Sequence, residues 1–208
     1  MSSLGKPGEA PTAVRLYPRI NLCCSDTSAF SSFDVSDPSN LALSQNETYT
    51  LDTPGPDPDR QIAPHLHHTI VDPTGKYILA PDLGADLIRV FQVQRGAIEW
   101  KQLAPAVATP GSGPRHGVWV AQGTKDYFYS FNELSNTITG FRVQYKRDGL
   151  KFKKLFDIPS HGPGTTVPEG TLAAELVASV SQLSNHPVLP QCRLITSARW
   201  PVHHRLLP

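Results

Sequence analysis

Histidine, arginine and glutamate side chains in three short segments could together carry out acid–base chemistry. His67 lies in the run Pro-His-Leu-His-His, Arg115 in Gly-Pro-Arg-His and Glu133 in Asn-Glu-Leu. An imidazole that titrates near neutral pH can take a proton from water or give one to a leaving oxygen. A guanidinium can hold a carboxylate or a phosphate through two hydrogen bonds and stabilise charge on a carbonyl oxygen. A carboxylate beside them could orient the imidazole or act as an acid or base itself.

Each of these side chains also has a purely structural alternative. His67 could hydrogen-bond to loop backbone, Arg115 could form a salt bridge between neighbouring sheets, and Glu133 could cap a turn or pair with Arg115. Residue types alone favour the structural alternative for His67, because few single histidines are catalytic.

Further histidines raise the question of a metal site. His65, His68 and His116 could contribute to a zinc site, but no carboxylate or cysteine stands at a familiar ligand spacing around them. The sequence shows no glycine-rich phosphate loop, no Gly-x-Ser-x-Gly nucleophile elbow and no Cys–His pairing for covalent catalysis. We therefore predict neither a metal nor a cofactor.

The candidate residues lie within an internal repeat whose period is about fifty residues, a length typical of propeller blades. Upstream of the aligned pairs listed below, and after a gap is introduced in the alignment, His67 falls opposite His116. Such a period suits a blade of four short antiparallel strands and is too long for a helical hairpin repeat. The aligned pairs are Tyr77 with Tyr127, Asp82 with Asn132, Asp86 with Asn136, Ile88 with Ile138, Phe91 with Phe141 and Val93 with Val143.

The strand chemistry inside each repeat agrees with a blade. Residues 76–80 and 126–131 are rich in aromatic and β-branched side chains, as buried strands are. Residues 87–93 and 137–143 alternate well enough for strands with two different faces. The turn at 72–75, Asp-Pro-Thr-Gly, joins two such strands. The sequence thus predicts an all-β fold, a partial β-propeller with two complete four-stranded blades and parts of their neighbours.

Composition narrows the class of protein. A length of 208 residues with 20 prolines and 15 glycines favours one loop-rich β domain. A net charge of +1 gives no electrostatic sign of a nucleic acid or membrane partner. No apolar run approaches the roughly eighteen residues that span a bilayer, and the start lacks an apolar signal core. We expect Cys23, Cys24 and Cys192 to be unpaired thiols and the protein to be cytoplasmic.

Five motifs in a fixed order give the sequence a resemblance to a known family. They are PHLH at 64–67, DPTGKY at 72–77, PDLGAD at 81–86, GSGPRH at 111–116 and NELS at 132–135. Between about residue 25 and about residue 175, the chain closely resembles the lactonase family of seven-bladed propellers. That family contains bacterial-type 6-phosphogluconolactonases and the fungal carboxy-muconate cyclising enzymes.

The resemblance implies a role for each candidate residue. His67 matches the family's active-site histidine, Arg115 its basic residue for substrate anions and Glu133 its acidic position. The implied activity is hydrolysis of a sugar lactone such as 6-phosphogluconolactone, in which His67 activates water, Arg115 holds the anionic group and stabilises the oxyanion, and Glu133 tunes the pair. The same residues could serve a muconate-type lactonising cycloisomerase, in which a proton goes to carbon. The implied partner is a small anionic lactone or carboxylate.

The same resemblance raises a question about the whole chain. A seven-bladed ring needs its last blade to meet its first, whereas this sequence holds two complete repeats, the end of one at 29–35 and the start of another. We expect an N-terminal segment at 1–24, a propeller fragment at 25–175 and a disordered or loosely helical tail at 176–208.

Two expectations follow from this fragmentary pattern. Unpaired blade edges favour self-association. The family's further substrate-binding arginine, expected in a later blade, has no match, since Arg199 and Arg205 lie in the tail. A non-catalytic binding module or an inactive truncated product is therefore the second functional alternative.

Overall fold

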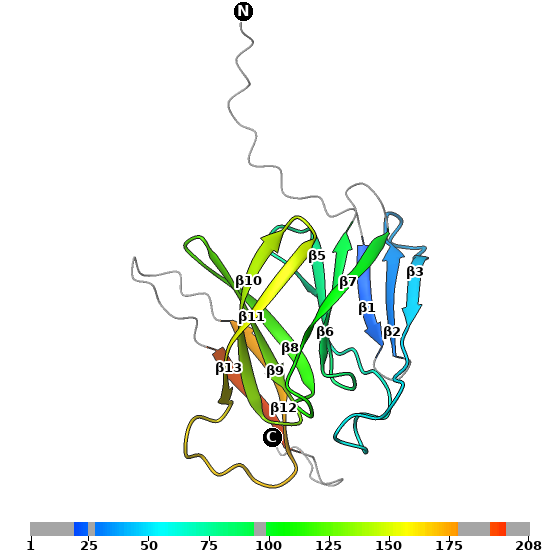
Figure 1. Cartoon of the computed structure of the whole chain (residues 1–208). Coiled ribbons are helices and arrows are strands. Elements are labelled where there is room, and N and C mark those ends of the chain that lie inside the picture. The colour runs from blue at the N-terminus through cyan, green and yellow to red at the C-terminus, as the bar shows by residue number, and fades with distance from the viewer. Residues whose placement is uncertain (1–18, 25–27, 94–98, 179–191, 199–208) are drawn as a thin grey trace, which may run out of the picture.

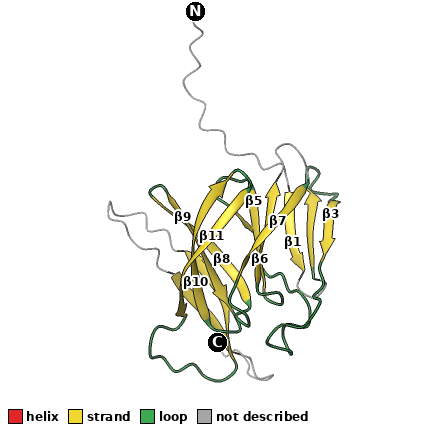
Figure 2. Ribbon diagram, viewed as in Figure 1, coloured by secondary structure: helices red, strands yellow, loops and turns green. Residues whose placement is uncertain are grey.

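The computed structural model describes residues 19–24, 28–93, 99–178 and 192–198, where all regular secondary structure is β-strand (Figure 2). Within these ranges, no helix is long and apolar enough to cross a membrane. The strands form antiparallel sheets that lie side by side (Figure 1). The first sheet comprises β1 (Arg19–Cys24), β2 (Ala29–Asp34) and β3 (Ala42–Thr48); the second β4 (Ile70–Val71), β5 (Tyr77–Asp82), β6 (Leu87–Val93) and β7 (Trp100–Val107); the third β8 (Pro114–Gln122), β9 (Lys125–Asn132), β10 (Thr137–Lys146) and β11 (Gly149–Pro159); the fourth β12 (Thr171–Ala178) and β13 (Cys192–Ala198).

The second and third sheets confirm the two predicted blades. In each sheet the strands lie in chain order, so every strand pairs with the one that follows it in the sequence. The aromatic and β-branched runs form β5 and β9, and the alternating runs form β6 and β10. The segment expected to end an earlier blade forms β2, the central strand of the first sheet.

One backbone position recurs in three sheets. Ser28, Asp86 and Asn136 stand directly before β2, β6 and β10 and have φ angles of 51°, 53° and 51°, the left-handed conformation. Short polar side chains tolerate this conformation better than most others. In each case the carbonyl accepts a hydrogen bond at 2.9 Å from the chain beyond the outer strand, donated by Tyr49, Ala108 and Ser160 respectively.

The side chains at this position also reach the next sheet. Each makes its hydrogen bonds to backbone that precedes or begins the first strand of the following blade. Ser28 Oγ donates to the carbonyl of Pro64 (2.6 Å), Asp86 accepts from the N–H groups of Gly111 (2.6 Å) and Gly113 (2.9 Å), and Asn136 Nδ2 donates to the carbonyl of Thr171 (2.8 Å).

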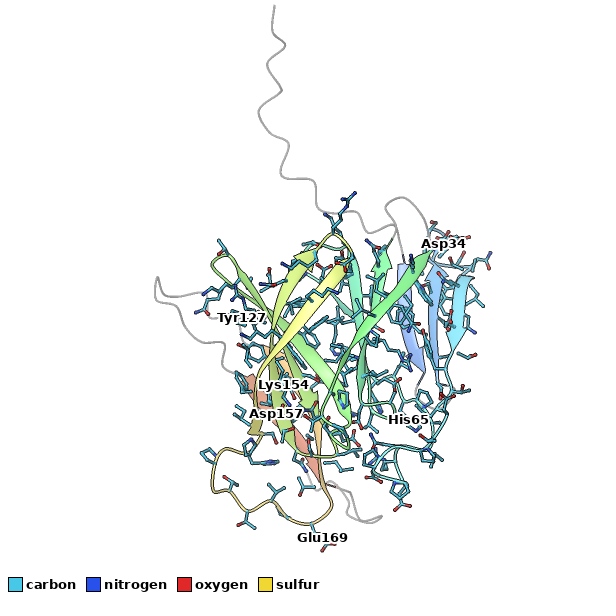
Figure 3. The ribbon with its side chains drawn as sticks, viewed as in Figure 1. Asp34, His65, Tyr127, Lys154, Asp157 and Glu169 are labelled. Carbon is cyan, nitrogen blue, oxygen red and sulfur yellow. The ribbon has the colours of Figure 1, made fainter. Side chains whose placement is uncertain are left out.

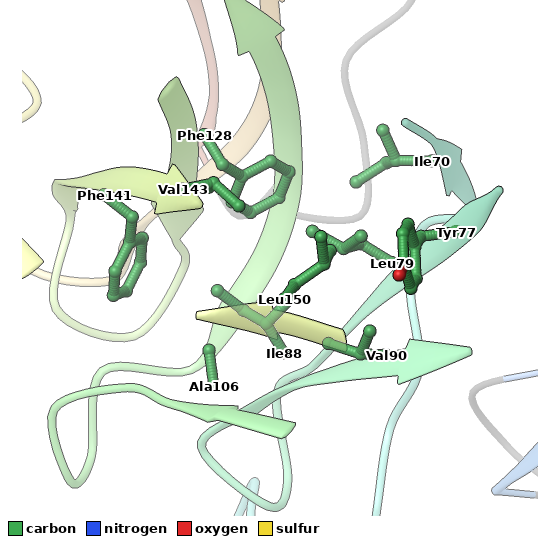
Figure 4. Packing of buried hydrophobic residues seen from close by; sticks show 10 residues of the cluster. All are labelled: Ile70, Tyr77, Leu79, Ile88, Val90, Ala106, Phe128, Phe141, Val143 and Leu150. Atoms are coloured by element: carbon green, nitrogen blue, oxygen red, sulfur yellow. The ribbon is translucent and has the colours of Figure 1, made fainter. Parts of the chain in front are cut away.

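Apolar side chains fill the spaces between the sheets. Between the first and second sheets, the ring of Phe30 stacks on Phe91 with centroids 4.1 Å apart, and Trp100 Nε1 donates to Ser32 Oγ at 2.8 Å. The second and third sheets share one core cluster (Figure 4), made of Ile70, Tyr77, Leu79, Ile88, Val90, Ala106, Phe128, Phe141, Val143 and Leu150. A smaller cluster joins the third and fourth sheets through Phe131, Ile138, Ala173 and Leu176.

The expected segment boundaries differ from the observed strands. β1 lies inside the segment expected at 1–24, and it pairs with β2 along its whole length. β12 runs past residue 175 to Ala178, and β13 pairs with it although no strand was expected there. The reason is that backbone pairing along β12 does not require the alternating pattern on which the sequence prediction relied. Residues 1–18, 179–191 and 199–208 lie outside the described residues.

Candidate active site

Backbone hydrogen bonds hold His67 against the end of β5. The His67 N–H donates to the carbonyl of Pro81 at 3.1 Å, and the Leu83 N–H donates to the carbonyl of His65 at 2.8 Å. The His65 N–H donates to Oδ1 of Asp82, a carboxylate with no solvent exposure, at 2.8 Å. The segment that carries His67 is therefore fixed on both sides before any substrate is present.

The surroundings of Asp82 explain how a buried carboxylate can serve as this anchor. Arg89 Nε donates to Asp82 Oδ2 at 2.7 Å, so the buried charge is paired. The Arg89 guanidinium also lies 3.8 Å from the centre of the Tyr49 ring, a cation–π contact. A Cβ at Gly84 would approach the carbonyl oxygen of Ala63 to 1.8 Å, so only glycine allows this loop to close on the His67 segment.

Two interlocked loops bring Arg115 and Glu133 together. The Glu133 N–H donates to the carbonyl of Gly113 at 2.8 Å, which ties the end of β9 to the start of β8. Gly113 has a φ of 62°, and a Cβ there would lie 2.5 Å from Leu134 Cγ. The pairing register of β8 shifts between Pro114 and His116, so Arg115 is the bulged residue.

Glu133 is shared by two arginines. Arg115 Nε lies 2.6 Å from Glu133 Oε2 as an ion pair, although its N–H is not aligned for a hydrogen bond. Arg60 Nη2 donates to Glu133 Oε1 at 2.5 Å. Pairing with Arg115 is what the structural alternative for Glu133 predicts. The second arginine, Arg60, comes from the loop between β3 and β4 and was not singled out from the sequence.

The positive charges of this cluster act on His67. Burial, and then the charges of Arg115, His65, His116 and Arg60, lower the pKa of His67 to about 4. At neutral pH the imidazole is therefore uncharged and can accept a proton. No described residue hydrogen-bonds to the His67 ring, so both ring nitrogens are available to a ligand.

The strand pairing corrects the predicted alignment of the histidines. Asp82 and Asn132 occupy the same place in their sheets; Leu66 bridges to Asp82, and Pro114 pairs with Asn132. His67 therefore corresponds to Arg115, and His68 to His116, one position away from the predicted match of His67 with His116. The cause is a difference in length between the two hairpins that join the first and second strands of each sheet. Six residues separate the paired residues Val71 and Ile78, whereas eight separate the equivalent pair Trp119 and Phe128.

His68, just before β4, forms a row with His116 in β8 and Glu175 in β12. The rings of His68 and His116 have centroids 4.6 Å apart, and His116 Nδ1 lies 2.6 Å from Glu175 Oε1. Burial, followed by the charge of His116, lowers the pKa of His68. Burial alone would raise the pKa of Glu175, but the hydrogen bond and charge of His116 outweigh it and lower that pKa.

This row supports Arg115 from the side. His116 Nε2 lies 3.4 Å from Arg115 Nη1, and the same Nη1 donates to the carbonyl of Ala174, the bulged residue of β12. Together with Glu133, these contacts hold the Nε and Nη1 sides of the guanidinium. From the sequence, His116 was a candidate only for a zinc site, and Glu175 carried no signal because the repeat ends there.

Two further features of the described residues concern metal ligands and an open hollow. Among them, no three His, Cys, Asp or Glu side chains are grouped closely enough to hold a metal ion. An open hollow of about 360 Å³ lies between β7 and β11, and its lining is mostly apolar, with Lys151 and Lys154 at its edge. Figure 3 labels Lys154 and Asp157 on this outer strand and His65 on the segment that leads into β4.

Comparison with known proteins identifies the architecture. The family model described as "Lactonase, 7-bladed beta-propeller" matches residues 25–183. A protein of Arthroderma benhamiae named "Probable 6-phosphogluconolactonase" is 37% identical over 164 residues, which cover 77% of this chain and 39% of that protein. A "6-phosphogluconolactonase" of Formosa agariphila is 33% identical over 101 residues, covering 47% and 28% respectively.

A solved structure shows the same fold. The periplasmic gluconolactonase of Pseudomonas aeruginosa is 25% identical, with a TM-score of 0.62, over 78% of this chain and 44% of that one. The chain thus spans less than half the length of each of these relatives. With its repeated four-stranded sheets and the family match across most of its length, the chain belongs to the lactonase family of seven-bladed β-propellers.

Proposed function

We propose that this chain contributes the site of a lactone hydrolase whose substrate is a small anionic sugar lactone such as 6-phosphogluconolactone. The observation that carries the proposal is the ion cluster of Arg60, Glu133 and Arg115, whose arginine charges help to keep His67 uncharged. The names of the relatives support lactone hydrolysis rather than muconate cyclisation.

The proposed reaction assigns one step to each side chain. His67 takes a proton from water while the water oxygen attacks the lactone carbonyl carbon. Arg115 stabilises the negative charge that develops on the carbonyl oxygen. The ring C–O bond then breaks, and the protonated His67 returns its proton to the leaving oxygen. Glu133 holds the guanidinium in place through the contact between its Oε2 and Arg115 Nε.

Substrate binding would raise the pKa of His67 to a value suited to a general base. A base with a pKa of about 4 is weak at neutral pH, and the charges of Arg115 and Arg60 contribute to that low value. An anion bound beside these arginines offsets their charges and so raises the pKa of His67 toward the working pH. The proposal thus couples recognition of the anionic group to activation of the base.

We also propose that the protein acts in the cytoplasm. A phosphorylated sugar carries permanent charge and remains in the compartment where it is made. The expected unpaired state of the three cysteines agrees with a reducing compartment.

Hydrolysis of 6-phosphogluconolactone by the full 208-residue chain tests the proposal. Since general-base catalysis contributes about 10²–10⁴-fold, His67→Ala should lower the enzymatic rate by that factor. His161→Ala is the matched control, because His161 lies in the loop after β11, where it contacts Ser160. A wild-type rate no faster than spontaneous opening at the same pH would refute the proposal, and so would an unchanged rate for His67→Ala.

A further inference from the structure

We propose that Arg60 is a second anion-binding residue of this site, acting with Arg115 on the same substrate anion across Glu133. This inference rests on the proposed function, because it concerns the same site. The family resemblance places a second substrate-binding arginine in a later blade, whereas Arg60 comes from the loop before β4. The arrangement therefore assigns the anion a different cationic partner.

The loop that carries Arg60 is built around a buried glutamine. Gln61 has no solvent exposure, and its Nε2 donates to the carbonyl of Leu83 at 2.8 Å. Its Oε1 accepts a hydrogen bond from the Asp57 N–H at 3.0 Å, and its own N–H donates to the Asp57 carbonyl at 2.7 Å. A Cβ at Gly55 would lie 2.8 Å from Gln61 Cβ, so the loop closes tightly. Arg60 is thus displayed from a fixed base, which reduces the entropy lost when it binds a ligand.

Both guanidiniums retain donors for a ligand. Arg60 uses Nη2 for Glu133, and no described residue accepts a hydrogen bond from its Nε or Nη1. Arg115 uses Nε and Nη1, and its Nη2 likewise has no acceptor among the described residues. The side chains of Arg60 and Arg115 are 31% and 26% exposed, whereas that of Glu133 is 8% exposed. Glu133 therefore lies beneath the two arginines, whose unused N–H groups can reach solvent.

The charges of the cluster favour an anion. One carboxylate is shared between two guanidiniums, so Glu133 neutralises one of their two positive charges. Planar guanidiniums bind phosphate and carboxylate oxygens through paired hydrogen bonds. Arg115 and Arg60 are both among the charges that lower the pKa of His67, so the imidazole lies within electrostatic range of the cluster. An anion held by Arg60 and Arg115 would then lie beside the proposed base.

Calorimetric binding of inorganic phosphate and of 6-phosphogluconate to the full chain tests the role of Arg60. Because hydrogen bonds to a charged group are lost, Arg60→Ala should weaken phosphate binding about 10- to 100-fold. Arg60→Lys keeps the charge but not the planar guanidinium, so its phosphate affinity should lie between those of wild type and Arg60→Ala. Arg147→Ala removes the same charge from the turn between β10 and β11 and should bind like wild type.

A double variant separates anion binding from mere neutralisation of Glu133. If Arg60 served only to neutralise that carboxylate, Arg60→Ala combined with Glu133→Gln would restore wild-type affinity. The proposal predicts that affinity stays low in the double variant. Three results would each overturn the proposed role of Arg60. They are wild-type affinity in Arg60→Ala, restored affinity in the double variant, and no phosphate binding by wild type. If Arg60→Ala fails to fold in a thermal melt, Arg60→Lys carries the test.

Two further comparisons complete the experiment. Gluconate lacks the phosphate of 6-phosphogluconate. If Arg60→Ala loses affinity only for 6-phosphogluconate, Arg60 binds the phosphate, and if it loses affinity equally for both ligands, Arg60 binds the carboxylate. Either result supports the proposal. Failure of this inference is distinguishable from failure of the proposed function. Intact phosphate binding with no lactone hydrolysis would refute the hydrolase and leave the role of Arg60 standing.

Discussion

His67 is half-buried and lies within electrostatic range of several cations, and its titration should therefore affect the stability of the fold. Its pKa is lowered from 6.5 to about 4, first by burial and then by the charge of Arg115 and its neighbours. Between these two values the unfolded chain binds more protons than the folded chain. The stabilising effect is complete above about pH 6.5, the ordinary pKa of histidine, and is lost as pH falls through the folded pKa.

This loss of stability at low pH can be measured by denaturant unfolding at pH 7 and pH 4.5. Wild type should lose stability on acidification, and His67→Gln should lose less, because a group that titrates in this interval has been removed. His68, whose pKa burial also lowers, remains in the variant and keeps part of the effect. His161→Gln provides the control. An equal loss in His67→Gln and wild type would contradict the assignment.

Sequence motifs were enough to propose His67, Arg115 and Glu133, and the structure brings the last two into direct contact. They were not enough for Arg60, because no repeat or motif spacing relates this loop residue to β8 or β9. Nor did they predict the contact between His116 and Glu175. Each of these two residues directly follows a bulge, in β8 and in β12, and bulges leave little trace in residue type.

At the scale of elements, the residue before the third strand of each blade links one sheet to the next. Asp86 is buried, adopts left-handed φ, and accepts hydrogen bonds from two backbone N–H groups that precede β8. Its repeat partner Asn136 was matched to it from the sequence. Ser28 was not matched, because a serine in a short polar segment carries too little pattern to reveal the same conformation.

Asp86→Ala should lower the free energy of unfolding by about 2–4 kcal/mol, because it leaves buried N–H groups without an acceptor and places alanine at positive φ. Asp86→Asn keeps an acceptor and tolerates the backbone conformation, so it should lose less. Asp148→Ala, in an exposed turn, serves as the control. Urea denaturation measures all three. A loss below about 0.5 kcal/mol in Asp86→Ala, the range of ordinary surface changes, would show that the link between sheets is unimportant.

At the scale of the whole molecule, the site depends on how the sheets pack. His67 lies on the segment before β4 of the second sheet. Arg115 lies in β8 of the third sheet and Glu133 directly after β9, while the carbonyl that receives Arg115 lies in β12 of the fourth sheet. The second and third sheets pack together through a shared core cluster (Figure 4). The sequence predicted the blades because their hydrophobic pattern repeats. It did not predict β13, because pairing with β12 is a backbone interaction at an edge.

A crystal structure of the full chain with 6-phosphogluconate tests most directly whether these sheets form one anion-binding site. We expect an anionic group of the ligand to lie between the guanidiniums of Arg60 and Arg115, above Glu133 and within reach of the His67 ring. A ligand bound elsewhere on the protein, or side chains of His67, Arg115 and Glu133 that point to separate surfaces, would contradict the account.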